Sequence, residues 1–306
     1  MSYAIVFPGQ GTQYAAMLPW LESEAGRSEA LLRLNQSLGA DWRVHLTEPE
    51  WSIRNDVAQP LLTGTCLAAW EAVRPLLPTP TAAAGYSIGE VAAFAAAGVF
   101  GVGDAMELAG QRAAAMDTCL GGRRTGLLSI TGASGESVEN WCRRHGLDIA
   151  IRIATDRCIV GGGAAALAAA EADALCASAS CKRLPVALAS HTPWLADAVA
   201  PFRRAIDAFT FAPPRMPVVC NRTGTALRGA AELRDALATQ IAHTLQWERC
   251  MDTLAERRVR CVLEVGPGST LSKMWNERHP SIPARSLDEF RATATAATWV
   301  REHTAA

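Results

Sequence analysis

The stretch Gly85-Tyr86-Ser87-Ile88-Gly89 follows Ala82-Ala83-Ala84, which can end a strand, and precedes an alanine-rich run from Glu90 to Ala97. Its G-x-S-x-G pattern is that of a nucleophile elbow, a strained strand-to-helix turn that needs small residues at its two flanks, the positions of Gly85 and Gly89. The alanine-rich run favours a helix, whose positive N-terminal end would lie beneath the serine oxygen. Because the pentapeptide alone also fits an ordinary tight turn, its context must decide. The favoured interpretation is acyl chemistry on Ser87.

Composition excludes several classes of protein. The 306 residues can form one large domain or two moderate ones, and 49% hydrophobic against 19% charged residues excludes a disordered chain. With a formal net charge of -1, the chain lacks the excess of positive charge that is typical of nucleic-acid-binding proteins. The longest apolar runs, Val91 to Val102 and Gly161 to Ala170, are too short or too rich in glycine and alanine to span a bilayer. We therefore expect a globular protein with no nucleic-acid or membrane partner.

The cysteines and the first residues indicate a location. Nine cysteines, an odd number, are scattered without a C-x-x-C pair or nearby histidines, as in a protein with reduced thiols and no metal site. The first seven residues lack the basic start of a secretion signal and are expected to form a buried strand. Both observations favour the cytoplasm. We assign the cysteines no function beyond that of small buried hydrophobes.

The pattern of strands and helices divides the chain into two subdomains. Residues 1–124 alternate short apolar strands with helical stretches, as in an α/β fold. Residues 125–189 follow the order β-α-β-β-α-β, which is typical of a ferredoxin-like unit. The large subdomain then resumes over 190–306, ending in a helix from Ala292 that we expect to fray. The six segments of the small subdomain are expected at Gly126–Thr131, Gly135–His145, Asp148–Ala154, Cys158–Gly161, Ala164–Ser178 and Lys182–Ala187.

Further segments of the large subdomain follow from the same pattern. We expect them to be helical at Thr192–Phe209, a strand at Met216–Cys220, mostly helical at Glu232–Glu256, and a strand at Cys261–Val265.

A serine nucleophile needs a base, and His191 is the best candidate. It lies in Ser190-His191-Thr192, where the small subdomain returns to the large one, and such junction loops often carry catalytic groups. A capping or surface histidine remains the alternative. The other histidines lie in polar or terminal settings and are expected at the surface: His45, His145, His243, His279 and His303.

Two more segments could complete such a site. Phe7 to Gln13 contains glycines that would let backbone N–H groups approach an oxyanion, although a plain strand-to-loop turn would look the same. The segment has neither the lysine of a Walker motif nor full G-x-G-x-x-G spacing, which disfavours a phosphate site. Arg112 stands alone among small residues of an expected helix, so it could aim a charge into a cavity or lie on a solvated face.

Together these motifs resemble one family, the malonyl-CoA:acyl carrier protein transacylases, in the same order and at similar spacing over nearly the whole chain. The motifs are Phe7-Pro8-Gly9-Gln10-Gly11-Thr12-Gln13, Gly85-Tyr86-Ser87-Ile88-Gly89-Glu90, Gln111-Arg112 with Met116, Ser190-His191, Gln240 seven residues before Trp247, and Glu264-Val265-Gly266-Pro267-Gly268.

The resemblance implies a fold and a set of roles. The fold would be an α/β-hydrolase-like large subdomain with an inserted ferredoxin-like small one. Ser87 would be the nucleophile, His191 its base, and the carbonyl of Gln240 would orient His191. The N–H groups of Gln10 and Ile88 would form the oxyanion hole, and Arg112 would pair with the malonyl carboxylate. Malonyl-CoA would be the donor and a carrier's thiol the acceptor, with no bound cofactor or metal.

Two departures from the family pattern bear on which branch of the family the chain resembles most. Tyr86 stands where the family usually has histidine, and a segment usually rich in asparagine reads Ile153-Ala154-Thr155-Asp156. With the ending Pro283 to Arg291, the tyrosine looks most like the epsilon subunit of malonate decarboxylase, which would make the acceptor the carrier subunit of that enzyme.

Three alternatives stay open: a malonyltransferase of fatty-acid or polyketide synthesis, a serine esterase or thioesterase, and a non-catalytic carrier-docking subunit. The resemblance also leaves open the oligomeric state and the range of acyl groups.

Overall fold

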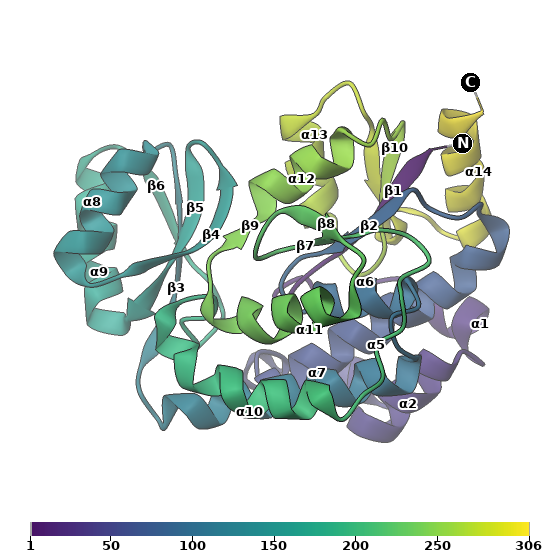
Figure 1. Cartoon of the computed structure of the whole chain (residues 1–306), viewed down its shortest axis with the longest axis horizontal. Coiled ribbons are helices and arrows are strands. Elements are labelled where there is room, and N and C mark those ends of the chain that lie inside the picture. The colour runs from purple at the N-terminus through teal and green to yellow at the C-terminus, as the bar shows by residue number, and fades with distance from the viewer. Residues whose placement is uncertain (1, 306) are drawn as a thin grey trace.

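A computed structural model describes residues 2–305 of the chain, with Met1 and Ala306 outside the described part. Its larger sheet has six strands in the order β11-β10-β1-β2-β7-β8 (Figure 1). All neighbouring strands are parallel except β7 and β8, which are antiparallel. The strands are β1 (Tyr3–Phe7), β2 (Ala82–Gly85), β7 (Val218–Cys220), β8 (Thr225–Leu227), β10 (Cys261–Glu264) and β11 (Ala284–Ser286).

Helices cover both faces of this sheet, which is why its central strands are continuous apolar runs. Tyr3, Ile5 and Phe7 of β1 pack into a cluster with α5 (Asn55–Val73), α6 (Gly89–Ala96) and α7 (Val102–Leu120). Ala4 and Val6 face the other way, toward α12 (Trp247–Ala255) and α13 (Thr270–Arg278). Figure 1 shows α12 and α13 above the sheet and α5, α7 and α10 (Ala196–Asp207) below it.

The remaining helices of the large subdomain are mostly short or peripheral. They are α1 (Leu21–Ala25), α2 (Glu29–Leu38), α3 (Trp42–His45), α4 (Pro49–Ser52), α11 (Ala230–Thr239), α14 (Thr293–Thr304) and single 3-10 turns at Arg74–Leu76, Pro193–Leu195, Gln240–Ala242 and Leu287–Glu289.

The second sheet has the order β6-β3-β5-β4-β9. Its first four strands and two helices occur along the chain as β-α-β-β-α-β, so the predicted fold class, including the ferredoxin-like unit, is confirmed. Figure 1 shows α8 and α9 on the outer face of this sheet, away from the large subdomain. The elements are β3 (Thr125–Thr131), α8 (Gly135–His145), β4 (Asp148–Ala154), β5 (Arg157–Gly163), α9 (Ala164–Cys176), β6 (Ser180–Arg183) and β9 (Leu245–Gln246).

Three details differ from the prediction. The last strand of the unit lies at Ser180–Arg183 rather than Lys182–Ala187, because Ser180 to Arg183 pair with β3. Residues 232–256 are mostly helical as predicted, but Leu245 and Gln246 interrupt the helices as β9, which pairs with β4. The fifth strand of the small sheet thus comes from 190–306, beyond the predicted 125–189. The final helix is present as α14, one face of which is buried.

Six of the nine cysteines are buried, and all nine are free thiols. No helix of residues 2–305 is long and apolar enough to cross a membrane.

Candidate active site

The pentapeptide forms a tight turn between β2 and α6, with Ser87 at φ 55°. Such a left-handed conformation is uncommon for a residue other than glycine. The two flanking glycines are required by contact: a Cβ on Gly85 would lie 2.0 Å from the carbonyl oxygen of Gly89, and one on Gly89 would lie 2.3 Å from that of Phe7. The turn therefore needs glycine on both sides of the serine.

Asn221, which directly follows β7, holds this turn from the neighbouring strand. Its Oδ1 accepts a hydrogen bond from the backbone N–H of Ser87 at 2.8 Å, and its Nδ2 donates to the carbonyl of Gly85. The start and the middle of the strained turn are thus fixed by one buried side chain. The sequence analysis did not identify Asn221; its place at the carboxyl end of a predicted parallel strand was the available signal.

Ser87, His191 and Gln240 form a hydrogen-bonded chain. The Oγ of Ser87 lies 2.8 Å from Nε2 of His191, and Nδ1 of His191 lies 2.7 Å from the carbonyl oxygen of Gln240. Because a carbonyl can only accept, Nδ1 carries the proton and Nε2 is free to accept from the serine hydroxyl. The backbone N–H of His191 also donates to the carbonyl of Ile241 at 2.8 Å. This geometry presents a neutral imidazole to the serine.

Burial keeps His191 neutral. It lowers the pKa of His191 to about 3, and the charge of Arg112 acts in the same direction, while the hydrogen bond to Gln240 opposes both. An imidazole that is unprotonated at neutral pH can accept the serine proton.

Arg112 of α7 lies in the same buried site, with 1% of its surface exposed. Its Nη1 donates to Oε1 of Gln59 and its Nη2 to Oε1 of Gln240, both at 2.8 Å. Nη2 is also 3.5 Å from Oγ of Ser87. Burial lowers the pKa of Arg112 to about 10, which leaves it charged at neutral pH. Of the two sequence interpretations, burial excludes the solvated helix face, and the guanidinium lies beside Ser87 instead.

Glu90, the residue after the pentapeptide, is buried beneath the site. Its two carboxylate oxygens accept hydrogen bonds from the backbone N–H of Asn221 and from Nε2 of Gln240, both at 2.7 Å. Burial raises the pKa of Glu90 to about 7 despite these bonds. The sequence analysis missed Glu90, although it is a lone charge in an alanine-rich helix, the same signal that singled out Arg112.

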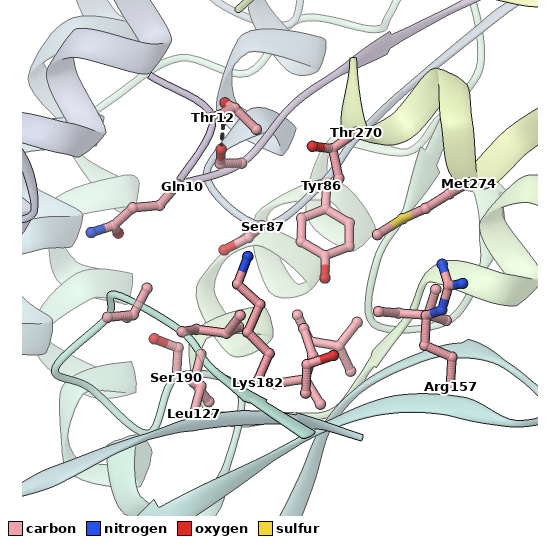
Figure 2. Close-up of a pocket in the computed structure, with 18 of the residues that line it drawn as sticks. Gln10, Thr12, Tyr86, Ser87, Leu127, Arg157, Lys182, Ser190, Thr270 and Met274 are labelled. Atoms are coloured by element: carbon pink, nitrogen blue, oxygen red, sulfur yellow. Dashed lines mark hydrogen bonds between the residues drawn. The ribbon is translucent and has the colours of Figure 1, made fainter. Parts of the chain in front are cut away.

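The backbone N–H groups of Gln10 and Ile88 are available beside Ser87. Neither has a hydrogen-bond acceptor among residues 2–305. Gln10 lies in the loop after β1, and Ile88 is the N-cap residue of α6, so both come from the carboxyl ends of adjacent strands. Figure 2 places Gln10 beside Ser87 at one side of the cavity. Two such donors can stabilise a negative oxygen.

A cavity of about 560 Å³ separates the elbow from the small sheet. Figure 2 shows Tyr86 and Ser87 entering it from the large subdomain, opposite Leu127 and Lys182 on the strands of the small one. The Tyr86 ring packs edge-on against Trp247, with ring centroids 5.2 Å apart. Much of the far wall is apolar: Leu127, Ile151, Ile153, Ile159, Leu184 and Val186. The cavity can therefore take a long, largely uncharged arm whose end reaches Ser87.

The remaining histidines lie outside this site and are partly or fully exposed, as predicted. Three of them lie beside acids: His145 is 2.8 Å from Asp173, His45 is 2.8 Å from Glu48, and His279 is 3.3 Å from Asp252.

The chain matches a family model over almost its whole length. Residues 4–306 match the model described as acyl transferase domain. The malonyl CoA-acyl carrier protein transacylase of Mycobacterium bovis is 33% identical over 93% of this chain and 95% of its own. That of Salmonella typhimurium is 28% identical over 97% of this chain and 99% of its own.

Solved structures agree with these matches. A crystal structure of malonyl-CoA:acyl carrier protein transacylase from Xanthomonas oryzae has a TM-score of 0.90 and 28% identity, covering 98% of this chain and 99% of that one. A structure of FabD from Acinetobacter baumannii has a TM-score of 0.89, also at 28% identity, and covers 98% of both chains.

Proposed function

The chain belongs to the acyl transferase domain family, and we propose that it moves a malonyl group from malonyl-CoA to the thiol of an acyl carrier protein. Its relatives named malonyl CoA-acyl carrier protein transacylase cover nearly all of its length, which supports this donor and this acceptor. The chemistry uses groups of the chain itself, so we propose no bound cofactor. We place the reaction in the cytoplasm, as the free thiols favour.

In the first half-reaction, Oγ of Ser87 attacks the thioester carbonyl while Nε2 of His191 takes its proton. The carbonyl oxygen becomes negative and accepts hydrogen bonds from the N–H groups of Gln10 and Ile88. Collapse of this intermediate breaks the carbon–sulfur bond, and CoA leaves as the thiol with the proton from His191. The malonyl group is now an ester on Ser87.

In the second half-reaction, His191 takes the proton of the carrier's thiol, and the sulfur attacks the ester. Collapse then returns the proton to Oγ of Ser87 and leaves the malonyl thioester on the carrier. The hydrogen bond from Nδ1 to the Gln240 carbonyl keeps the ring in the required orientation during both steps.

The observation that carries the proposal is the buried Arg112 with Nη2 3.5 Å from Oγ of Ser87. A charged guanidinium in a dry site is costly unless a carboxylate arrives to pair with it. An esterase of neutral esters has no use for such a cation, whereas a malonyl ester presents a free carboxylate beside the reacting carbonyl. The assembled serine and histidine also argue against a subunit that only docks a carrier.

The comparisons favour the fatty-acid type of enzyme over the malonate decarboxylase subunit that the sequence analysis preferred. The relatives at 28% to 33% identity reported above bear the name malonyl CoA-acyl carrier protein transacylase, not that of a malonate decarboxylase subunit. We therefore propose an acceptor carrier with a phosphopantetheine arm. The rival branch predicts faster transfer to a carrier with a phosphoribosyl-dephospho-CoA arm, so transfer rates to both carriers at equal concentration will separate the two.

Intact-protein mass spectrometry after mixing with malonyl-CoA tests the acyl-enzyme. We expect a malonyl adduct on the wild-type chain and none on Ser87→Ala, because no other hydroxyl of residues 2–305 forms a hydrogen bond with a histidine ring. An adduct that persists in Ser87→Ala would place the nucleophile elsewhere.

Removal of Arg112 tests the choice of acyl group. Loss of a buried charge partner costs about 2–5 kcal/mol. Arg112→Ala should thus lose malonyl transfer by roughly 30-fold to several thousandfold, at about 1.4 kcal/mol per decade. Acetyl transfer should fall far less or rise. An equal loss for both acyl groups would make Arg112 a structural residue.

A further inference from the structure

The guanidinium of Arg112 is held by neutral partners. Its two terminal nitrogens donate to side-chain oxygens of Gln59 and Gln240, each at 2.8 Å. Amide oxygens orient a guanidinium but carry no formal charge. Buried arginines usually contact an opposite charge directly, and Arg112 is 1% exposed. The positive charge is therefore held in position beside Ser87 without a direct counter-ion.

The nearest acid is separated from Arg112 by an amide group. Gln240 accepts from Arg112 through Oε1 and donates to Glu90 through Nε2, at 2.8 and 2.7 Å. No carboxylate among residues 2–305 forms an ion pair with Arg112. Glu90 thus offsets the charge of the site as a whole but leaves the guanidinium unpaired.

We propose that Gln59 determines the acyl specificity of this enzyme, by holding Arg112 with an uncharged oxygen so that the counter-ion must come from the acyl group. This inference rests on the proposed malonyl transfer. Gln59 is buried in α5, and the one hydrogen-bond partner of its Nε2 within residues 2–305 is Sδ of Met116, at 3.6 Å. It makes no hydrogen bond to Ser87 or His191.

The position also makes Gln59 the better of the two glutamines to change. Gln240 donates to the carbonyl of Ser87 and to Glu90, so an acid there would break contacts of the nucleophile itself. An acid at 59 keeps the shape of the side chain and adds a charge only beside Arg112. The substitution Gln59→Glu thus places a carboxylate of the protein beside Arg112, in the role that we propose for the carboxylate of the malonyl group.

The experiment measures kcat/KM of Gln59→Glu with malonyl-CoA and with acetyl-CoA. Because the new carboxylate competes for Arg112, malonyl transfer should fall by about 30-fold or more, from the cost of 2–5 kcal/mol for a desolvated charge partner. Acetyl transfer should stay within about 3-fold of wild type or rise, since it makes no use of the guanidinium charge. The malonyl-to-acetyl ratio is the readout that a loss of packing would not change.

Two further variants serve as controls, each with a thermal melt. Gln59→Met keeps the size but removes the oxygen, so the ratio should fall by about 3- to 30-fold from poorer orientation of Arg112. Gln36→Glu adds the same charge on the exposed face of α2 and should leave both rates unchanged.

The outcomes separate the inference from the function on which it rests. If the wild-type chain transfers no malonyl, the proposed function fails. If it prefers malonyl but both Gln59 variants keep the wild-type ratio, the inference is overturned and the function stands. If Gln59→Glu does not fold, Gln59→Met decides: a lowered ratio supports the inference, and an unchanged ratio overturns it.

Discussion

Gln240 shows how much of the site depends on one residue. Its carbonyl accepts from the imidazole of His191, its Oε1 accepts from Arg112, and its Nε2 donates to the carbonyl of Ser87 and to Glu90. Every polar atom of this buried residue that faces the site is paired. Because a network of this kind is satisfied only as a whole, small displacements of one member are transmitted to the others.

Asn221 supports a test at the residue scale. Asn221→Ala leaves the N–H of Ser87 and the carbonyl of Gly85 without their partner in a buried turn. We expect the free energy of unfolding to drop by about 2–4 kcal/mol. We also expect kcat to drop by about 10- to 100-fold, because Ser87, the proposed nucleophile, loses its fixed position. Urea denaturation and steady-state kinetics measure the two effects.

Asn276 provides the matched control for Asn221. Its side chain also bridges a backbone carbonyl and an N–H, both of Ala284, at 3.0 and 2.9 Å, but far from Ser87 along the sheet. Asn276→Ala should lower stability and leave kcat unchanged. If both variants lose kcat in proportion to stability, Asn221 has no role beyond folding.

At the scale of elements, the elbow depends on how closely β1, β2 and α6 approach. Tyr86 N–H donates to the carbonyl of Phe7 at 2.8 Å, and Gly89 lies against the same carbonyl. The first turn of α6 therefore packs directly against the ends of β1 and β2. A close approach of this kind is possible only where a residue lacks a Cβ.

Gly89→Ala tests that approach. The added methyl carbon would lie 2.3 Å from the carbonyl oxygen of Phe7, so the helix must move away from the strand. We expect transfer activity to fall by at least about 100-fold, because displacement of the nucleophile by 1 Å is enough for such a loss.

Gly110→Ala is the control for Gly89→Ala. Gly110 lies inside α7 with open space at its Cβ position. That variant should gain about 0.5–1 kcal/mol of stability from the better helix former and keep its activity. Full activity in Gly89→Ala would mean that the turn tolerates a side chain.

Glu264 at the end of β10 gives a prediction about pH. Its buried carboxylate accepts the N–H groups of Leu271 and Ser272 in the first turn of α13, at 3.2 and 2.8 Å. Burial nevertheless raises its pKa from 4.5 to about 7. The folded chain therefore holds a proton that the unfolded chain has lost between these pH values. The stability that Glu264 contributes is complete below pH 4.5 and is lost as the pH rises through about 7.

The comparison of wild type with Glu264→Gln isolates this effect, since Glu90 titrates alike in both proteins. The difference in unfolding free energy, wild type minus variant, should fall by about 2–3 kcal/mol between pH 5 and pH 8. Urea denaturation across this range measures it. A difference that is constant with pH would show that Glu264 is ionised in the folded chain throughout.

At the scale of the whole molecule, the two subdomains share a core. Leu127, Ile151 and Ile153 of the small sheet belong to the same hydrophobic cluster as Trp247 and Trp275 of the large subdomain. Strand β9 also extends the small sheet along β4. The ion pair of Arg157 with Glu277, at 2.9 Å, joins β5 to α13 across the cavity. The cavity therefore lies between two subdomains that contact each other through a shared hydrophobic cluster, a strand pairing and an ion pair.

This shared core predicts that residues 125–189 do not fold stably alone. The isolated segment would expose the cavity face of its sheet and leave the edge of β4 unpaired, which is typical of aggregation-prone edges. We expect it to bind a hydrophobic dye and to melt without a cooperative transition, in contrast to the full chain. Cooperative melting without dye binding would contradict this.

The sequence by itself determined the fold class, and its motifs singled out residues that the structure brings together at the candidate site. The alternation of apolar strands and helices, the glycines around Ser87 and the position of His191 at a junction all follow from local rules. The resemblance to the transacylase family supplied Ile88 and Gln240, and it gave roles to Gln10 and Arg112, whose segments the sequence pattern had already singled out.

Only the tertiary structure decided which groups surround these residues. Gln59, Glu90 and Asn221 reach the site from α5, α6 and the end of β7, and their hydrogen bonds join residues 53, 150 and 134 positions apart in the chain. No local pattern encodes such pairings, because they depend on the order of strands in the sheet and on the packing of helices against it. The same reason explains β9, whose two residues become a strand only because β4 lies beside them.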